Sequence, residues 1–208
     1  FAGGLVSATV GFSAPAVLAA MALGKYLSAV FPILDATIVA TVSVILFHLI
    51  HGQSIKIGTF IQGGATVIKI GLIVLFITMG LINPTPQDIS ILPKAGDIEL
   101  LFSSGFAISL VWVSYAYTGW NSSVYIAGEV VNPKVNIPKS LLLSTVFVMV
   151  LYVLLNYVFL YSTPIPLMIN ELEVGYIAGV NIFGEFGAKI IGLGIATLLV
   201  STVSSYIF

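Results

Sequence analysis

Six apolar stretches alternate with short polar segments along the chain. A helix needs about 20 mostly apolar residues to cross roughly 30 Å of hydrocarbon, and each stretch approaches or exceeds that length. The predicted spans are residues 1–23, 34–50, 58–81, 100–127, 140–161 and 187–208. We therefore predict an all-α integral membrane protein, with residues 1–208 forming a single transmembrane domain and no separate soluble domain.

Composition strengthens the membrane prediction. The chain is 59% hydrophobic and 7% charged, whereas a soluble domain carries about 25% charged residues. It has no cysteine, which excludes disulfides and thiolate metal sites, and it has no arginine for contacts with phosphates or bases. We therefore expect no nucleic-acid partner, and the lipid bilayer as the surrounding medium.

The polar gaps between spans predict an orientation. The second gap carries Lys56, and the fourth carries Glu129, Lys134 and Lys139, so both gaps are net positive. Because lysine-rich short loops stay in the cytoplasm, the first span should run from inside to outside. The chain begins at Phe1 within an apolar stretch, which we interpret as a fragment of a longer protein.

Lys69 is the most informative single residue. If the third span begins at Gly58, Lys69 lies 11 residues inside it, or about 16 Å along the helix. An ammonium at that depth costs at least about 2.5–3.5 kcal/mol, so it must face a cavity or a partner. The functional hypothesis is a proton-coupling or counter-charge lysine. The alternative is a permanently charged lysine that is bonded to backbone carbonyls for structural reasons.

The fourth span contains a polar and aromatic run. Residues 114–123 read Ser-Tyr-Ala-Tyr-Thr-Gly-Trp-Asn-Ser-Ser, well before Glu129. Irregular backbone at membrane depth survives only where it lines a cavity or is buried in protein, and discontinuous helices are typical of secondary transporters. We predict a broken helix here. A continuous helix with an interfacial aromatic belt is the alternative.

Further hydroxyl and imidazole groups are candidates for weaker sites. Ser201, Ser204 and Ser205 share one helix face, and their hydroxyls could coordinate a cation or accept from an ammonium; bonding to neighbouring carbonyls is the equally good alternative. His48 and His51 are three residues apart but have no evident third ligand, so we predict no metal site. The chain shows no nucleophile–base or metalloprotease motif, so we predict that it is not an enzyme and needs no cofactor.

A family resemblance becomes visible at the fourth span. The segment Tyr115-Ala-Tyr-Thr-Gly-Trp-Asn121 is followed by Tyr125, Glu129, Asn132-Pro133 and Ile137-Pro138-Lys139. These spaced motifs resemble the amino acid–polyamine–organocation superfamily, and most of all its L-type amino acid transporter branch. The flanking spans agree, with Lys69 in the family's helix 5 and Gly24-Lys25-Tyr26 closing its helix 3. On this alignment the chain corresponds to helices 3 to 8 of twelve.

The resemblance implies a fragment of a five-plus-five inverted-repeat, leucine-transporter-like fold with a broken helix 6. It also implies an amino acid substrate, held by the backbone and side chains of the helix 6 break. The substrate-binding residues that it implies are Tyr115, Ala116, Tyr117, Thr118, Gly119, Trp120 and Asn121. Lys69 would replace a sodium ion near helices 1 and 8, with Ser201, Ser204 and Ser205 facing that site as coupling residues.

We therefore expect secondary active transport of amino acids by alternating access, as proton-coupled symport or exchange, in a multi-pass protein of the plasma (inner) membrane. Three alternatives remain open: a polyamine or organocation transporter, a non-transporting membrane remnant or accessory subunit, and an intramembrane enzyme. Two departures from the family pattern bear on this expectation. Gly128-Glu129 stands where the family often has two acids, and His48 to His51 stand where it commonly has asparagine.

Overall fold

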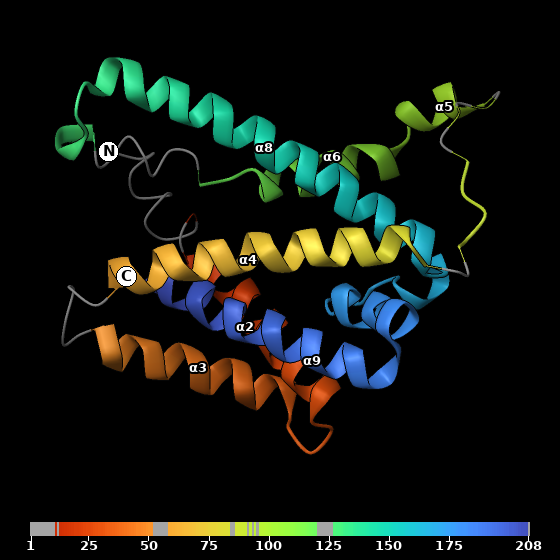
Figure 1. Cartoon of the computed structure of the whole chain (residues 1–208), viewed down its shortest axis with the longest axis horizontal. Coiled ribbons are helices and arrows are strands. Elements are labelled where there is room, and N and C mark those ends of the chain that lie inside the picture. Colours follow the sequence, from red (N-terminus) through yellow and green to blue (C-terminus); the bar gives the residue numbers. More distant parts are fainter. Residues whose placement is uncertain are drawn as a thin grey trace. The chain divides into compact units, whose positions relative to one another are not determined.

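The structure, a computed structural model, describes residues 11, 13–51, 58–83, 86–90, 92, 94, 96–119 and 127–207, and most of these residues lie in helices. No β-strand occurs within these residues, which confirms the all-α prediction for them. The elements are α2 (Ser13–Val30), α3 (Ala36–His51), α4 (Gly58–Leu81), α5 (Asp97–Leu101), α6 (Ser104–Ala116), η2 (Ala127–Glu129), α8 (Pro133–Ser162), η3 (Ile165–Leu167) and α9 (Val174–Ile207) (Figure 1).

The chain divides into two compact units. Unit 1 comprises Phe1–Gln87 and Leu155–Phe208, and unit 2 comprises Asp88–Leu154. Unit 1 is thus discontinuous in sequence. Helix α8 belongs to both units, because the boundary falls inside it.

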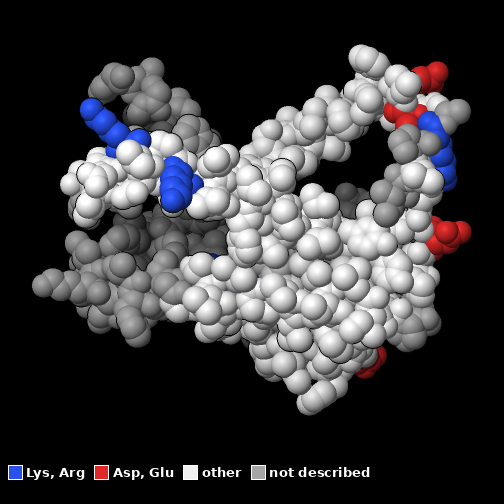
Figure 2. Space-filling model, turned by 45° about the horizontal axis from the view of Figure 1, so that its top comes forward, with Lys and Arg blue, Asp and Glu red and all other residues white. Residues whose placement is uncertain are grey.

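Within the described ranges, three helices are long and apolar enough to cross a membrane, namely α2, α8 and α9. Three shorter apolar helices cover Ala36–Leu49, Thr66–Leu81 and Ser104–Ala116. Each of the six predicted spans overlaps one of these helices; that the helices cross the membrane stays a prediction. The face drawn in Figure 2 is mostly uncharged, as a lipid-facing surface requires.

Unit 1 has a core built on small residues. Helix α2 packs against α3 and α9, and α4 also packs against α9. One buried cluster joins the first three of these helices through Ala19, Ala20, Ala40 and Val203. Small side chains let helix backbones approach closely. At Gly24 the approach is so close that a Cβ atom would collide with the carbonyl oxygen of Ala36.

Helix α2 extends further than the sequence predicted. The first span was expected to end at Leu23 and the helix to close at Gly24-Lys25-Tyr26, but α2 continues to Val30. A lysine can be accommodated in this extension because it has partners of opposite charge: the Lys25 ammonium lies 3.8 Å from carboxylate oxygens of Glu171 and Glu173. The first ten residues of that predicted span lie outside the described residues.

Helix α9 also begins earlier than predicted, at Val174 rather than near residue 187. Its first turn is fixed by the carbonyl of Glu173, which accepts from the N–H groups of Tyr176 and Ile177 at 2.8 and 3.1 Å. The helix is interrupted at Gly184, where φ is 71° and ψ is 175°. Glycine adopts a positive φ without steric penalty. Helix α9 therefore consists of two helical segments, residues 174–183 and 185–207.

Unit 2 contains α5, α6 and the first part of α8. The Ser103 hydroxyl caps α6 by accepting from the N–H of Phe106 at 3.1 Å. Helix α8 begins at Pro133, ahead of the predicted span at 140. Proline is favoured at the first helical position because its missing N–H would have no partner there. The carbonyl of Asn132 accepts from Val135 and Asn136, both at 3.0 Å, and completes this start.

Candidate functional site

Helix α6 ends inside the predicted fourth span, at Ala116. The N–H groups of Tyr117 and Thr118 donate to the carbonyls of Ser114 and Tyr115 at 3.2 and 3.0 Å, so the last turn tightens to three-residue bonds. Gly119 follows with φ of 99°. That conformation is unfavourable for residues with a Cβ atom, and it turns the backbone away from the helix axis. Helix α6 thus ends within the predicted fourth span; that a second helical segment follows, as a broken helix requires, stays a prediction.

The backbone at this helix end has partners from two sources. The Thr118 hydroxyl donates to the carbonyl of Tyr115 at 2.8 Å, within the turn itself. The carbonyl of Ala116 accepts at 3.4 Å from the hydroxyl of Tyr152 on α8. Polar groups therefore replace part of the helical hydrogen bonding that ends at Ala116.

Aromatic rings surround the same turn. Tyr117 packs edge-on against Tyr152 with ring centroids 5.5 Å apart, and Tyr115 packs edge-on against Trp112 at 6.5 Å. Sequence reasoning missed Tyr152, which stands in an unremarkable apolar run of α8. Trp120 and Asn121, also predicted to bind substrate, lie outside the described residues.

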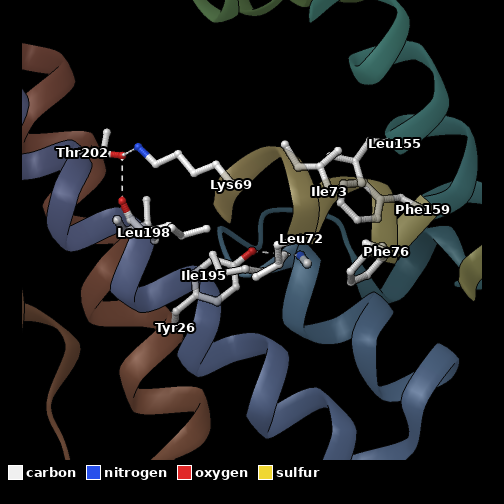
Figure 3. Close-up of a pocket in the computed structure, with 12 residues that line it drawn as sticks. Tyr26, Lys69, Leu72, Ile73, Phe76, Leu155, Phe159, Ile195, Leu198 and Thr202 are labelled. Carbon is white, nitrogen blue, oxygen red and sulfur yellow. Dashed lines mark hydrogen bonds between the residues drawn. The ribbon is translucent and has the colours of Figure 1, made fainter. Parts of the chain in front are cut away.

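A second candidate site lies within unit 1, around Lys69 of α4. The ammonium of Lys69 donates to the hydroxyl of Thr202 on α9 at 2.9 Å, and that hydroxyl donates to the carbonyl of Leu198 at 3.0 Å (Figure 3). Lys69 therefore has a side-chain partner on another helix and is half-buried; its depth in the membrane stays a prediction. Both side chains line a cavity of about 290 Å³.

The rest of the cavity lining is mostly apolar. Helix α2 contributes Tyr26. Helices α4, α8 and α9 contribute the others, which are Leu72, Ile73, Phe76, Leu155, Phe159, Gly175, Ile195, Leu198 and Leu199. Among the described residues, none of those that line the cavity is acidic. In the view of Figure 3, Lys69 and Thr202 lie on one side of the cavity and Phe76 and Phe159 on the other.

The predicted coupling serines lie on the same helix as Thr202 but outside this lining. Ser201 and Ser204 are half-buried, while the exposed Ser205 donates its hydroxyl to the carbonyl of Ser201 at 2.7 Å. Sequence reasoning missed Thr202, although it is next to Ser201, because only the packing of α9 against α4 selects that face. Within the described ranges, no three histidine or acidic residues come together in a way that could hold a metal ion.

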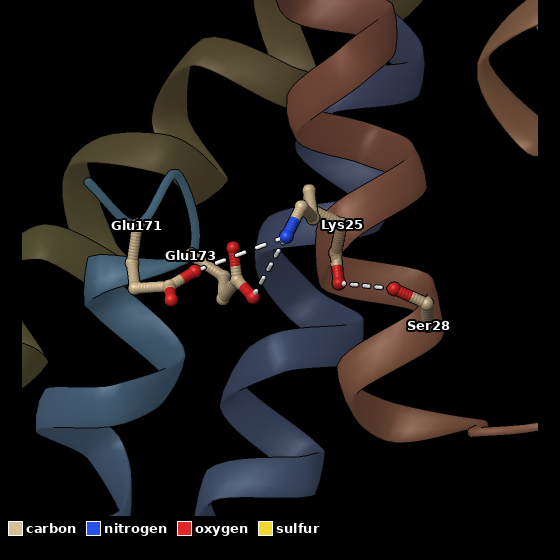
Figure 4. Close-up of polar contacts among 4 residues, drawn as sticks. All are labelled: Lys25, Ser28, Glu171 and Glu173. Carbon is tan, nitrogen blue, oxygen red and sulfur yellow. Dashed lines mark hydrogen bonds and ion pairs between the residues drawn. The ribbon is translucent and has the colours of Figure 1, made fainter. Parts of the chain in front are cut away.

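The end of α2 is tied to the start of α9 beside the cavity. The hydroxyl of Tyr26 accepts from the N–H of Gly175 at 3.0 Å. The neighbouring Lys25 forms its two ion pairs with Glu171 and Glu173 just before α9 begins (Figure 4). A Cβ atom at Gly175 would lie 2.7 Å from the Tyr26 hydroxyl, so this contact requires glycine.

Comparisons with known proteins agree with these features. The amino acid permease family model matches residues 2–208 of this chain. The low-affinity methionine permease of Saccharomyces cerevisiae is 28% identical over 96% of this chain and 40% of its own length. Solute carrier family 7 member 12 of Mus musculus is 32% identical over 53% of this chain and 24% of its own. The b(0,+)-type amino acid transporter 1 of Mus musculus is 25% identical over 73% of this chain and 32% of its own.

The chain thus spans between a quarter and two-fifths of the length of these relatives. Their names are those of transporters and permeases rather than enzymes, in agreement with the prediction that the chain is not an enzyme. The match over residues 2–208 also confirms the resemblance that was based on Tyr115 to Lys139. The chain is an integral membrane protein that belongs to the amino acid permease family.

Proposed function

We propose that the complete protein transports amino acids across the plasma membrane by alternating access, as proton-coupled symport or exchange. The observation that carries the proposal is the end of α6 at Ala116, followed by Gly119 with φ of 99° inside an apolar span. Irregular backbone at such a position exposes polar groups that a substrate can bind. The names of the relatives supply the substrate class.

In this proposal the substrate binds at the α6 end. A free α-ammonium needs carbonyl acceptors, and the last carbonyls of an α-helix have no partner within the helix. Residues Tyr115 to Gly119 supply such acceptors together with aromatic surface, and Trp120 and Asn121 complete the predicted pocket. Alternating access then requires the turn at Tyr117–Gly119 to change shape while α6 itself stays helical.

The test of substrate binding uses Gly119. Replacing it with leucine places a branched side chain at a positive φ, which costs about 1–2 kcal/mol and fills the turn. Amino acid binding by the complete protein in proteoliposomes should be lost in Gly119→Leu and kept in Gly105→Leu, because Gly105 is exposed near the start of α6. Unchanged binding in Gly119→Leu would contradict the proposed site.

Lys69 has the coupling role in this proposal. It is a cation in the third predicted span, and its partner Thr202 lies on a different helix. An interaction between two helices can respond to a change in charge, and this is what coupling to a proton requires. Ser201, Ser204 and Ser205 extend the hydroxyl-rich part of α9 around Thr202.

The coupling role is tested by Lys69→Ala in the complete protein. Accumulation of amino acid driven by a pH gradient should be abolished, whereas counterflow exchange should persist if the site at α6 is intact. Lys189→Ala is the matched control, since Lys189 is an exposed lysine of α9. Full accumulation in Lys69→Ala would refute coupling. Absence of any uptake by the unsubstituted protein would favour the accessory-subunit alternative instead.

A further inference from the structure

Tyr152 of α8 contacts two successive residues at the end of α6. Its hydroxyl donates to the carbonyl of Ala116 at 3.4 Å, and its ring packs edge-on against Tyr117 with centroids 5.5 Å apart. The hydrogen bond joins residues 36 positions apart, and all three residues belong to unit 2. The shape of the α6 end therefore depends on a second helix as well as on its own turn.

The Tyr152 hydroxyl acts where the hydrogen bonding of α6 changes. In a continuous α-helix, each carbonyl accepts from the N–H four residues further on. Helix α6 ends at Ala116, and the N–H groups of the next two residues donate instead to the carbonyls of Ser114 and Tyr115. Carbonyls at a helix end need partners from outside the helix. Tyr152 supplies such a partner to the last residue of α6.

These contacts suit the support of a binding site for an ammonium. A site binds its ligand more tightly when neighbouring contacts already hold its groups in the bound geometry. A phenol hydroxyl holds a carbonyl without adding charge, whereas a lysine in its place would repel the ammonium of a substrate. Helix α8 runs from Pro133 to Ser162, so Tyr152 projects from a long regular element rather than from a loop.

We propose that Tyr152 is a positioning residue for the amino acid site: its hydroxyl orients the Ala116 carbonyl and its ring holds Tyr117. It acts through these two residues rather than by touching the substrate. This inference rests on the transport function proposed above, in which both residues belong to the binding site. Helix α8 thereby keeps the end of α6 in the shape that binds the amino acid.

The first experiment compares variants of the complete protein in proteoliposomes. Radiolabelled methionine is the first probe, because a methionine permease is among the relatives, and other neutral amino acids follow. Tyr152→Phe keeps the ring but removes the hydroxyl, and should raise the dissociation constant about twofold to tenfold. Tyr152→Leu also removes the ring contact and should raise it by a further factor of about two to ten. The exchange rate at saturating amino acid should stay the same in Tyr152→Phe.

A rescue and a control separate positioning from general stability. Incorporation of 4-aminophenylalanine at position 152 restores a donor in the same place and should recover most of the lost affinity. Tyr157→Phe is the matched control, since Tyr157 lies on the same helix and stacks on Tyr161. It should leave the dissociation constant unchanged. Unfolding by sodium dodecyl sulfate should be alike in Tyr152→Phe, Tyr157→Phe and the unsubstituted protein.

A second measurement observes the Ala116 carbonyl itself by nuclear magnetic resonance. Ala116–Tyr117 is the only Ala-Tyr pair in this sequence, so carbonyl-¹³C alanine together with ¹⁵N tyrosine marks its peptide bond. The substitution Ala116→Gly identifies the signal if the complete protein holds another such pair. The carbonyl resonance should move upfield in Tyr152→Phe, because the carbonyl loses a donor, and should stay in place in Tyr157→Phe.

The outcomes distinguish this inference from the function on which it rests. If Gly119→Leu abolishes binding while Tyr152→Phe leaves the dissociation constant unchanged, the role of Tyr152 is refuted and the proposed function stands. An Ala116 resonance that does not move in Tyr152→Phe refutes the role of Tyr152 in the same way. If the unsubstituted protein binds no amino acid, both the function and this inference are refuted.

Discussion

The two units of the chain differ in how they use their apolar residues. In unit 1, α2, α3 and α9 bury small side chains against one another, and Ala20, Val158 and Val203 are at most 1% exposed. In unit 2, Leu151 is the only buried hydrophobic residue among those the structure describes, and α6 buries none. Both units expose large apolar side chains, but among the described residues unit 1 buries most of the core residues.

This difference indicates which interactions stabilise each unit. Tight packing of small residues stabilises unit 1 through van der Waals contacts, which lipid replaces poorly at such close approach. Unit 2 owes its order to local features, namely the Ser103 cap, the Asn132–Pro133 start of α8 and the Tyr152 contact with the α6 end. Its outward-facing leucines and valines suit lipid or other protein. Substitutions should therefore affect the two units unequally.

The largest difference is expected from leucine truncation. Leu23 on α2 is 2% exposed and Leu142 on α8 is 67% exposed. Leu23→Ala removes packed methyl groups and should lower the free energy of unfolding by about 2–5 kcal/mol. Leu142→Ala should change it by less than about 0.5 kcal/mol. Unfolding by sodium dodecyl sulfate, followed by circular dichroism in mixed micelles, compares them. Equal losses would mean that unit 1 is not packed as described.

Replacing one tyrosine in each unit should give a smaller difference in the free energy of unfolding. Tyr26→Phe leaves the N–H of Gly175 without its acceptor in a buried place, and should cost about 1–3 kcal/mol. Tyr152→Phe removes a long hydrogen bond of 3.4 Å at an exposed site and should cost at most about 0.5 kcal/mol. The same unfolding titration measures both. A greater loss in Tyr152→Phe would reverse the comparison between the units.

Replacing one lysine in each unit should give the smallest difference in the free energy of unfolding. Lys25→Met removes the ion pairs with Glu171 and Glu173 and should cost up to about 1 kcal/mol, since Lys25 and Glu171 are both 40% or more exposed. Lys134→Met in unit 2 should have no measurable effect. Screening by salt should remove the stabilisation in the unsubstituted protein but not in Lys25→Met. An identical salt dependence in both proteins would show that the ion pairs contribute nothing.

The sequence predicted helices better than it predicted contacts. Each of the six apolar runs in the sequence overlaps an apolar helix of the structure. The composition of Tyr115 to Gly119 indicated the region where α6 ends, because glycine and polar residues in an apolar run are a local signal. Charge was more misleading. Gly24-Lys25-Tyr26 was expected to close a helix, yet α2 continues to Val30, and the ion-pair partners of Lys25 come from a distant part of the chain.

Partners between helices could not be predicted in the same way. Periodicity shows which residues share one face of a helix, but not which other helix that face meets. Lys69 could be singled out from its depth, whereas its partner Thr202 depends on how α4 packs against α9. The same holds for Tyr26 and Gly175, which no motif connects.

The hydrogen bond between Tyr26 and Gly175 joins residues that are 149 positions apart. Ribosomes add about 5–20 residues per second, so roughly 7–30 s pass between the synthesis of its two partners. During that interval α2 is already made while the surface it will bury against α9 has nothing to meet. Unit 1 therefore stays incomplete until unit 2 has been synthesised. An insertion factor or chaperone that shields apolar helices would act during this interval.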